Sequence, residues 1–348
     1  MRFSIAAIIL VALSVTALLM PMLIKLFHKK SLVDRIGKRK IHENDIPSMG
    51  GVGFFAAFAI TVLLLSSYEQ LAEHRVELLT ISIMFVVGLR DDLIELKPIS
   101  KLLAQLVPTF FLIYLTNLVF PSLYNFLGIG EIPYWVGVSL SLLTIVGLTN
   151  SFNLIDGLDG LAGGLALVGF LAFGTWFYIQ GIEYYTLIAF AFAGSLLGFL
   201  YFNWQPAKIF MGDTGALVIG FILAIFCIRF IEINASLPKA TFLKINSVIT
   251  MAVSILIVPI FDTLRVITVR LLRRQSPFSA DQNHTHHMLL RLGLTHAQTT
   301  LLLVGVNIAF ILLAFVLDFL GDNILMPIIV GLIIILSVTL HYLSDKKI

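Results

Sequence analysis

Long apolar runs recur along the whole chain and are separated by short polar connections. We predict eleven membrane-spanning helices, because runs of about 20 apolar residues are long enough to cross a bilayer. The predicted spans cover residues 3–27, 49–67, 76–90, 99–119, 134–150, 160–178, 184–202, 213–231, 245–270, 297–318 and 325–343. No connection is long enough for a separate soluble domain, so residues 1–348 are expected to form a single transmembrane domain.

Composition agrees with this pattern. The chain is 59% hydrophobic and only 12% charged, about half of the charged fraction of roughly 25% that is usual in soluble domains. A soluble globular protein is therefore excluded, and an all-α polytopic integral membrane protein is favoured. The only cysteine, Cys227, lies inside an apolar run, which excludes a disulfide framework and a Cys-based metal site. No nucleic-acid partner is expected.

Positive charges are divided unequally between the two predicted membrane faces. Of the 23 Lys and Arg residues, 18 fall on one side and five on the other. The five are Arg2, Arg75, Arg229, Lys239 and Lys244. The positive-inside rule places the larger set in the cytoplasm, so we expect the N-terminus outside and the C-terminus inside. The polar residues that could perform chemistry gather in the cytoplasmic loops, which predicts one composite site on that face.

The polar stretch from Asn153 to Gly164 lies between two apolar runs. If it is helical, the three-residue spacing of Asn153, Asp156 and Asp159 puts all three on one face. Two carboxylates and an amide at a membrane boundary suit a divalent cation with phosphate, or a sugar nucleotide. The alternative is an interfacial loop whose aspartates cap the next helix.

Carboxylates also stand at the ends of the third and eighth predicted spans. Asp91 and Asp92 follow the third span, where a carboxylate could take a proton from a lipid phosphate or bind Mg²⁺. The alternative is a solvated helix end beside Arg90. Asp213 begins the eighth span after Gly212. It is a candidate metal ligand, and an N-cap role is an alternative that does not exclude the first.

A histidine loop, residues 284–287, follows the basic pair Arg273 and Arg274. Its imidazoles first indicate zinc, but the loop has no cysteine partner and Mg²⁺ prefers oxygen ligands. A cationic loop that holds a diphosphate beside the arginines agrees better with the sequence. A solvated basic loop is the alternative. Four isolated residues, His28, His74, His296 and His341, receive no role.

Taken together, these motifs resemble the polyprenyl-phosphate N-acetylhexosamine-1-phosphate transferase family, whose bacterial members include WecA, TagO and MraY. The resemblance extends from Pro47-Ser48-Met49-Gly50-Gly51 to the histidine loop, nearly the whole chain. It implies an enzyme of the bacterial plasma membrane that moves a sugar 1-phosphate from a UDP-sugar to a polyprenyl phosphate. UMP is released, and the implied cofactor is Mg²⁺ or Mn²⁺.

The resemblance also implies roles for individual residues. Asp91 and Asp92 match the paired catalytic aspartates, and the first is favoured as base or nucleophile toward the lipid phosphate. The implied metal ligands are Asp213, Asn153 and Asp156. The implied substrate-binding residues are Asp159, Asn203 near the nucleobase, Ser48, Lys38, Arg39, Arg273, Arg274, His284, His286 and His287. Attraction of cytoplasmic charge to anionic lipid explains Lys38 and Arg39 equally well.

The His-Thr-His-His order resembles the WecA/TagO branch, whose members usually use UDP-N-acetylglucosamine, whereas MraY-like members carry three contiguous histidines. This chain has Gln282 where that branch commonly has a basic residue, which leaves one phosphate contact and the sugar open. The implied reaction transfers N-acetylglucosamine 1-phosphate to undecaprenyl phosphate and initiates a cell-envelope polysaccharide. A muramoyl-pentapeptide transferase and an ion-coupled transporter are alternatives, although a transporter would place its ionisable residues near the bilayer midplane. A homodimer is one open option for the assembly.

Overall fold

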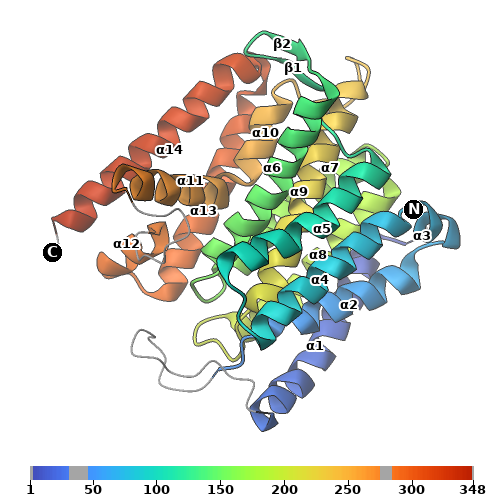
Figure 1. Cartoon of the computed structure of the whole chain (residues 1–348), viewed down its shortest axis with the longest axis vertical. Coiled ribbons are helices and arrows are strands. Elements are labelled where there is room, and N and C mark those ends of the chain that lie inside the picture. The colour runs from blue at the N-terminus through green and yellow to red at the C-terminus, as the bar shows by residue number, and fades with distance from the viewer. Residues whose placement is uncertain (1–2, 31–45, 275–283, 347–348) are drawn as a thin grey trace.

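A computed structural model describes residues 3–30, 46–274 and 284–346 as a helical bundle with one small hairpin (Figure 1). The helices are α1 (Ile5–Lys29), α2 (Gly50–Leu65), α3 (Tyr68–Glu73), α4 (Arg75–Leu93), α5 (Pro98–Thr116), α6 (Tyr134–Ile155), α7 (Leu161–Ile179), α8 (Glu183–Asn203), α9 (Gly212–Ser236), α10 (Val248–Ile255), α11 (Ile257–Leu272), α12 (Thr285–Arg291), α13 (His296–Val316), the short 3-10 helix η1 (Asp318–Leu320) and α14 (Asp322–Asp345). Strands β1 (Ser122–Phe126) and β2 (Ile129–Glu131) pair antiparallel.

Every predicted span coincides with a helix or, for the ninth, with the pair α10–α11. Among the described residues, eight helices are long and apolar enough to cross a membrane, or nine if that bent pair counts as one span. The other two predicted spans are α2, which has only 16 residues, and α4, which is charged at both ends. The chain is thus an all-α polytopic membrane protein, and eleven crossings stay a prediction.

Helix α9 lies at the centre of the bundle and packs against α2, α4, α6 and α7. Its residues from Thr214 to Ile228 are all buried, as expected for a helix that is apolar on every side. Edge-to-face phenylalanines join it to α7, with ring centroids 5.8 Å apart for Phe170 and Phe226 and 5.5 Å apart for Phe173 and Phe230. A rigid α9 gives the loop before it a fixed base.

The connections lie at two ends of the bundle. We call one the hairpin end, where β1 and β2 lie in Figure 1, and the other the site end, where α4 ends and α9 begins. The hairpin was not predicted from the sequence, which gave only a connector there. It is fastened to α14, because the Leu127 N–H donates to Asn323 Oδ1 at 2.6 Å and Asn323 Nδ2 donates to the Asn125 carbonyl at 3.0 Å.

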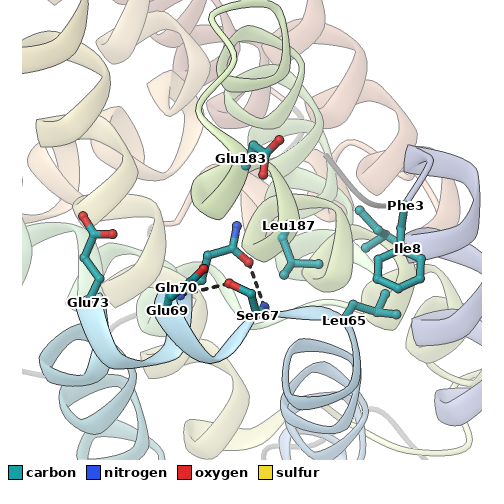
Figure 2. A pocket seen from close by; sticks show the side chains of 9 residues that line it. All are labelled: Phe3, Ile8, Leu65, Ser67, Glu69, Gln70, Glu73, Glu183 and Leu187. Carbon is teal, nitrogen blue, oxygen red and sulfur yellow. Dashed lines mark hydrogen bonds between the residues drawn. The ribbon is translucent and has the colours of Figure 1, made fainter.

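A cavity of about 390 Å³ opens between the beginnings of α1 and α8 and the segment from the end of α2 through α3. Figure 2 shows apolar side chains such as Phe3 and Leu187 along one part of it and Glu69, Glu73 and Glu183 along another. It lies at the opposite end of α8 from Asn203. This cavity is therefore separate from the residues that the sequence singled out.

Candidate active site

At the site end, the structure brings together residues from four helices that are distant in sequence. The centre is Lys101, in the first turns of α5. Its Nζ lies 2.8 Å from Asp91 Oδ2, 2.7 Å from Asp213 Oδ1 and 2.9 Å from Asn153 Oδ1. Three of the predicted residues thus share one ammonium group, and Lys101 itself was counted in the sequence only as a cytoplasmic charge.

The turn between α4 and α5 explains how Lys101 reaches Asp91. The Leu96 N–H donates to Asp91 Oδ1 at 2.7 Å, which closes the turn, and Pro98 then starts α5. Asp91 is almost fully buried, with 5% of its surface exposed. One oxygen of its carboxylate therefore accepts from the backbone and the other contacts Lys101, so the alternative of a solvated helix end is wrong.

Asp92 caps the start of α9. Its Oδ1 accepts a hydrogen bond from the Asp213 N–H at 2.7 Å, and its Oδ2 accepts from the Thr214 N–H at 2.9 Å and from the Thr214 hydroxyl. The N-cap position itself is Met211, whose side chain makes no capping bond. The alternative that Asp213 is the N-cap is wrong, because Asp92 performs that task from α4 and leaves the Asp213 carboxylate facing Lys101.

Ser48 lies in a segment that pairs with the chain just before α9. The Phe210 N–H donates to the Pro47 carbonyl, and the Gly50 N–H donates to the Phe210 carbonyl, each at 2.8 Å. Gly212 has a φ of +75°, and a Cβ on it would lie 1.8 Å from the Ser48 carbonyl oxygen. Only glycine fits this approach. The backbone from Pro47 to Gly50 is therefore fixed beside Asp213.

The stretch after Asn153 is not one helix. Helix α6 ends at Ile155, Asp156 is its C-cap, and the chain turns before α7. The expectation of three residues on one helical face is wrong, since only Asn153 is helical. Asn153 Nδ2 donates to Asp213 Oδ1, so this residue still meets the carboxylate with which the sequence associated it.

Asp156 accepts a hydrogen bond from the Gly212 N–H. Burial, together with the negative charges of Asp213, Asp92 and Asp159, raises the pKa of Asp156 to about 8. Carboxylates that disfavour one another's ionisation in this way would be relieved by a cation. The electrostatics at this position therefore favour a positively charged ligand.

Asn203 and Asp159 hold the two loops that flank the site. Asn203 Oδ1 accepts from the Gly160 N–H at 2.9 Å, and its Nδ2 donates to the Ile209 carbonyl at 2.8 Å. Asp159 Oδ2 lies 3.4 Å from the Ala207 nitrogen and 3.8 Å from His296 Nδ1. Both buried side chains are thus engaged with the protein, and His296, which received no role from the sequence, contacts the site.

The histidine loop is anchored by Asp262 of α11, a residue that the sequence analysis missed. His284 Nδ1 lies 2.7 Å from Asp262 Oδ2, and the Thr285 N–H donates to Asp262 Oδ1 at 2.7 Å. Asp262 is 2% exposed. A carboxylate inside a long apolar span was the signal that could have identified it. Because His284 and Asp262 are buried together, the alternative of a fully solvated loop is wrong.

His286 points toward the α6–α7 loop. It is 2% exposed, its ring nitrogens have no hydrogen-bond partner among the residues that the structure describes, and a Cβ on Gly157 would lie 2.7 Å from its Nε2. Burial first, and then the charge of His287, lower the pKa of His286 to about 3. The prediction of a cationic loop therefore fails at this residue, which is neutral near pH 7.

The basic residues predicted from the sequence are only partly described. Arg273 and Arg274 are exposed at the end of α11. Lys38, Arg39 and Gln282 lie outside the described residues. Their predicted contacts with phosphate stay predictions.

The donor chemistry fits a hard cation in part. The atoms around Lys101 are carboxylate and amide oxygens, which Mg²⁺ prefers. Within residues 3–30, 46–274 and 284–346, no three His, Cys, Asp or Glu side chains are arranged to hold a metal by themselves. These oxygens could supply some of the ligands of such a cation, and phosphates commonly supply others to Mg²⁺ in proteins.

Fold and site together define a polytopic membrane enzyme whose charged groups meet at one end of an apolar bundle. Residues 74–231 match the model of glycosyl transferase family 4, and with the relatives described next this shows that the chain belongs to that family. The resemblance predicted from the motifs is confirmed.

Relatives with assigned names cover most of the chain. A Bacillus subtilis protein, named probable undecaprenyl-phosphate N-acetylglucosaminyl 1-phosphate transferase, is 33% identical over 88% of this chain and 83% of its own length. A Yersinia pestis protein, named undecaprenyl-phosphate alpha-N-acetylglucosaminyl 1-phosphate transferase, is 30% identical over 79% of this chain and 74% of its own. A Levilactobacillus brevis phospho-N-acetylmuramoyl-pentapeptide-transferase is 38% identical, but over only 60% of this chain.

Proposed function

We propose that this protein transfers N-acetylglucosamine 1-phosphate from UDP-N-acetylglucosamine to undecaprenyl phosphate and releases UMP. The observation that carries the proposal is the meeting of Asp91 and Asp213 on the Lys101 ammonium, at one end of a bundle whose outer helices expose apolar side chains to lipid. The names of the Bacillus and Yersinia relatives support the choice of sugar and acceptor.

The geometry suits a reaction between two anions. An arriving lipid phosphate offers Lys101 a new partner, so the ammonium can leave Asp91 and hold the phosphate. Asp91 then accepts the proton of the lipid phosphate as a general base. The freed oxygen forms a bond to the phosphorus that carries the sugar. The bond from that phosphorus to the UMP oxygen breaks, and the electron pair leaves with UMP.

The proposed cofactor is Mg²⁺ or Mn²⁺. Asp213, Asn153 and Asp156 would hold it, since the first two already contact each other. Burial and then the neighbouring carboxylates raise the pKa of Asp156, and a bound cation would offset that negative charge. When bound, the metal would offset charge on the diphosphate as its bond breaks. Asp92 supports this arrangement indirectly by fixing the start of α9.

The proposed orientation follows the distribution of basic residues. The site end would face the cytoplasm of a bacterial cell, where UDP-sugars are made, with the N-terminus outside and the C-terminus inside. The histidine loop lies at that end and would contact the donor diphosphate. Asp91, Lys101 and Asp213 lie near helix ends at this face and not in the middle of their helices, which disfavours the alternative of an ion-coupled transporter.

A donor panel tests the proposal. Purified protein in detergent would be given undecaprenyl phosphate and labelled UDP-N-acetylglucosamine, UDP-N-acetylgalactosamine or UDP-N-acetylmuramoyl-pentapeptide. We expect UMP and a lipid-linked product with the first donor, and no UMP when the lipid is left out. The Levilactobacillus relative supports the pentapeptide donor as the second candidate. Product formed only from that donor would replace the proposed sugar, and no UMP from any donor would overturn the reaction class.

A further inference from the structure

The ninth predicted span is broken inside the bundle. Helices α10 and α11 meet at Leu256 with their axes 80° apart, and Figure 1 shows α11 running across the direction of α10. A break of this kind removes helical hydrogen bonds, here near Ile255 and Val258. In an apolar environment each unsatisfied backbone group is costly, so a break persists only where a neighbour supplies partners.

Asn307 of α13 supplies those partners. Its Nδ2 donates to the Ile255 carbonyl at 3.0 Å, and its Oδ1 lies 3.4 Å from the Val258 nitrogen. The side chain is completely buried. The same side-chain amide thus contacts both sides of the break. Its N–H group bonds the last residue of α10, and its oxygen faces the backbone nitrogen of the second residue of α11.

The direction of α11 decides where the histidine loop lies. Asp262 follows Val258 by one helical turn, and it binds His284 and Thr285 at 2.7 Å each. His286 then reaches Gly157 of the α6–α7 loop. Helix α13 also holds the α6–α7 loop, because the Thr300 hydroxyl donates to the Asp159 carbonyl at 2.9 Å. The contact between His286 and the α6–α7 loop is therefore held from α13 on both sides. Asn307 acts on the histidine loop through α11, and Thr300 acts on the α6–α7 loop directly.

We propose that Asn307 is a positioning residue: it holds the α10–α11 break, and through Asp262 it places His286 against the α6–α7 loop. For its effect on donor binding, the inference rests on the proposed function of the histidine loop. It predicts that loss of the Asn307 amide displaces the loop while Asp91, Lys101 and Asp213 keep their contacts.

Asn234 provides a matched control. It is also buried, and its amide makes the same two kinds of backbone contact, donating to the Ile245 carbonyl at 2.7 Å and accepting from the Ile245 N–H at 2.8 Å. These contacts lie at the hairpin end. Asn307→Leu and Asn234→Leu therefore remove similar bonds of similar burial, and only the first should reach the histidine loop.

The first measurement needs no turnover. Full-length protein in detergent would be treated with diethyl pyrocarbonate, and modification of His286 followed by peptide mass spectrometry, with the exposed His341 as internal reference. We expect His286 to react slowly in the wild type and in Asn234→Leu, and roughly tenfold faster in Asn307→Leu, as for a buried group released by lost positioning. In Asn307→Gln, which keeps the amide, His286 should react at a rate between those of the wild type and Asn307→Leu. This variant takes the place of the leucine variant if that one does not fold.

The second measurement is steady-state kinetics. The Asn307→Leu variant should raise KM for the UDP-sugar roughly tenfold or more, with a smaller change in kcat, while Asn234→Leu leaves KM unchanged. Equal His286 reactivity in the two leucine variants, or unchanged reactivity in both, would overturn the inference. A wild type that transfers no sugar phosphate would instead overturn the proposed function, and the His286 comparison would still decide the role of Asn307.

Discussion

Lys101 shows how one cation organises the site. Its ammonium contacts oxygens of Asp91, Asn153 and Asp213, so one cation lies between two carboxylates that would otherwise repel each other. A phosphate that binds here competes with the carboxylates for the same ammonium. Lys101 is therefore poised to exchange a protein anion for a substrate anion, which would free Asp91 for proton transfer.

We predict that Asp91→Asn lowers turnover by roughly 10²–10⁴-fold, the usual contribution of a general base, and leaves UDP-sugar binding largely intact. The reason is that Asp91 acts on the lipid phosphate and not on the donor. UMP release measures the first effect and calorimetric titration with UDP-sugar the second. Near wild-type turnover at neutral pH would remove Asp91 from the mechanism.

Metal dependence should separate Asp213 from the histidine loop. Asp213→Ala should abolish activity at every Mg²⁺ concentration, because it loses the proposed ligand. Replacing His284 should weaken donor binding without changing the Mg²⁺ requirement. Titration of Mg²⁺ at saturating donor compares the two variants. Full rescue of Asp213→Ala by excess Mg²⁺ would contradict the assignment, as would a preference for Zn²⁺ that disappears with the histidines.

The pKa of Asp156 gives a pH prediction for the metal-free protein. Its ordinary value is 3.8 and the folded value about 8, so its stabilising contribution is present below about pH 4 and is lost as the pH rises through 8. In EDTA, the melting temperature should fall more between pH 5 and pH 9 for the wild type than for Asp156→Asn. Adding Mg²⁺ at pH 9 should recover the wild type more than the variant. An equal fall in melting temperature for the wild type and Asp156→Asn would show that ionisation of Asp156 does not destabilise the folded protein.

The sequence predicted the acidic residues of the site better than their partners. Asp91, Asn153 and Asp213 stand out because charged and amide groups are rare beside apolar spans. The ion pair between Lys101 and Asp213 joins residues 112 positions apart, and no local pattern reveals such a pairing. Asn203 was assigned to substrate from the resemblance, whereas its amide binds two backbone groups that only the folded loops bring together.

At the scale of elements, α4 and α9 are joined by polar contacts at both ends. Fifteen residues separate Glu77 from Asp92 on α4, and fifteen separate Thr214 from Arg229 on α9, or about 22 Å on each helix. Glu77 Oε1 lies 3.3 Å from Arg229 Nη2, and Asp92 binds the start of α9. Because the spacing along α4 equals the spacing along α9, the Glu77–Arg229 and Asp92–Thr214 contacts form together only when the two helices are in this one register.

We predict that Glu77→Gln destabilises the protein by at most about 3–5 kcal/mol, since it removes the buried one of the two carboxylates that pair with Arg229. The double variant Glu77→Gln with Arg229→Gln should recover much of this loss. Glu232→Gln is the matched control, because Glu232 pairs with Arg229 at 2.8 Å but is 39% exposed, and exposed pairs contribute about 0–1 kcal/mol. Thermal unfolding in detergent measures all three variants. Equal effects of the Glu77 and Glu232 variants would show that the Glu77–Arg229 contact does not hold α4 against α9.

Helices were predictable from the sequence because apolar length alone identifies them. The 80° break after α10 was not predicted, although Pro259 was a signal for it, because proline has no N–H to donate to the Ile255 carbonyl. The side chain that satisfies the break belongs to Asn307, about fifty residues later, and no local pattern identifies it. The loop at Asp156 was misjudged for a related reason. Three-residue spacing favours a helix, but the Asp156 carboxylate accepts a hydrogen bond from the Gly212 N–H at the start of α9, and Asp159 contacts Ala207 and His296.

At the scale of the whole molecule, the basic residues and the site agree on one end of the bundle. The segments that carry Lys101, the α8–α9 loop and the end of α11 all lie at the site end, and 18 of the 23 Lys and Arg residues were assigned to that face from the spans alone. The site thus lies at the end to which the predicted spans assign most of the basic residues, and the cytoplasmic orientation of that end stays a prediction.

We predict from this that the C-terminus is cytoplasmic and that the hairpin lies outside. A reporter that matures only outside the cytoplasm should give no signal when fused after Ile348 and a strong signal when inserted at Gly128, between β1 and β2. A fluorescent protein that folds in the cytoplasm should give the reverse. Signal from the outside reporter at Ile348 would mean one crossing fewer. The error would then lie in α2 or α4, because these are the two predicted spans whose length or charge falls short of a membrane-crossing helix.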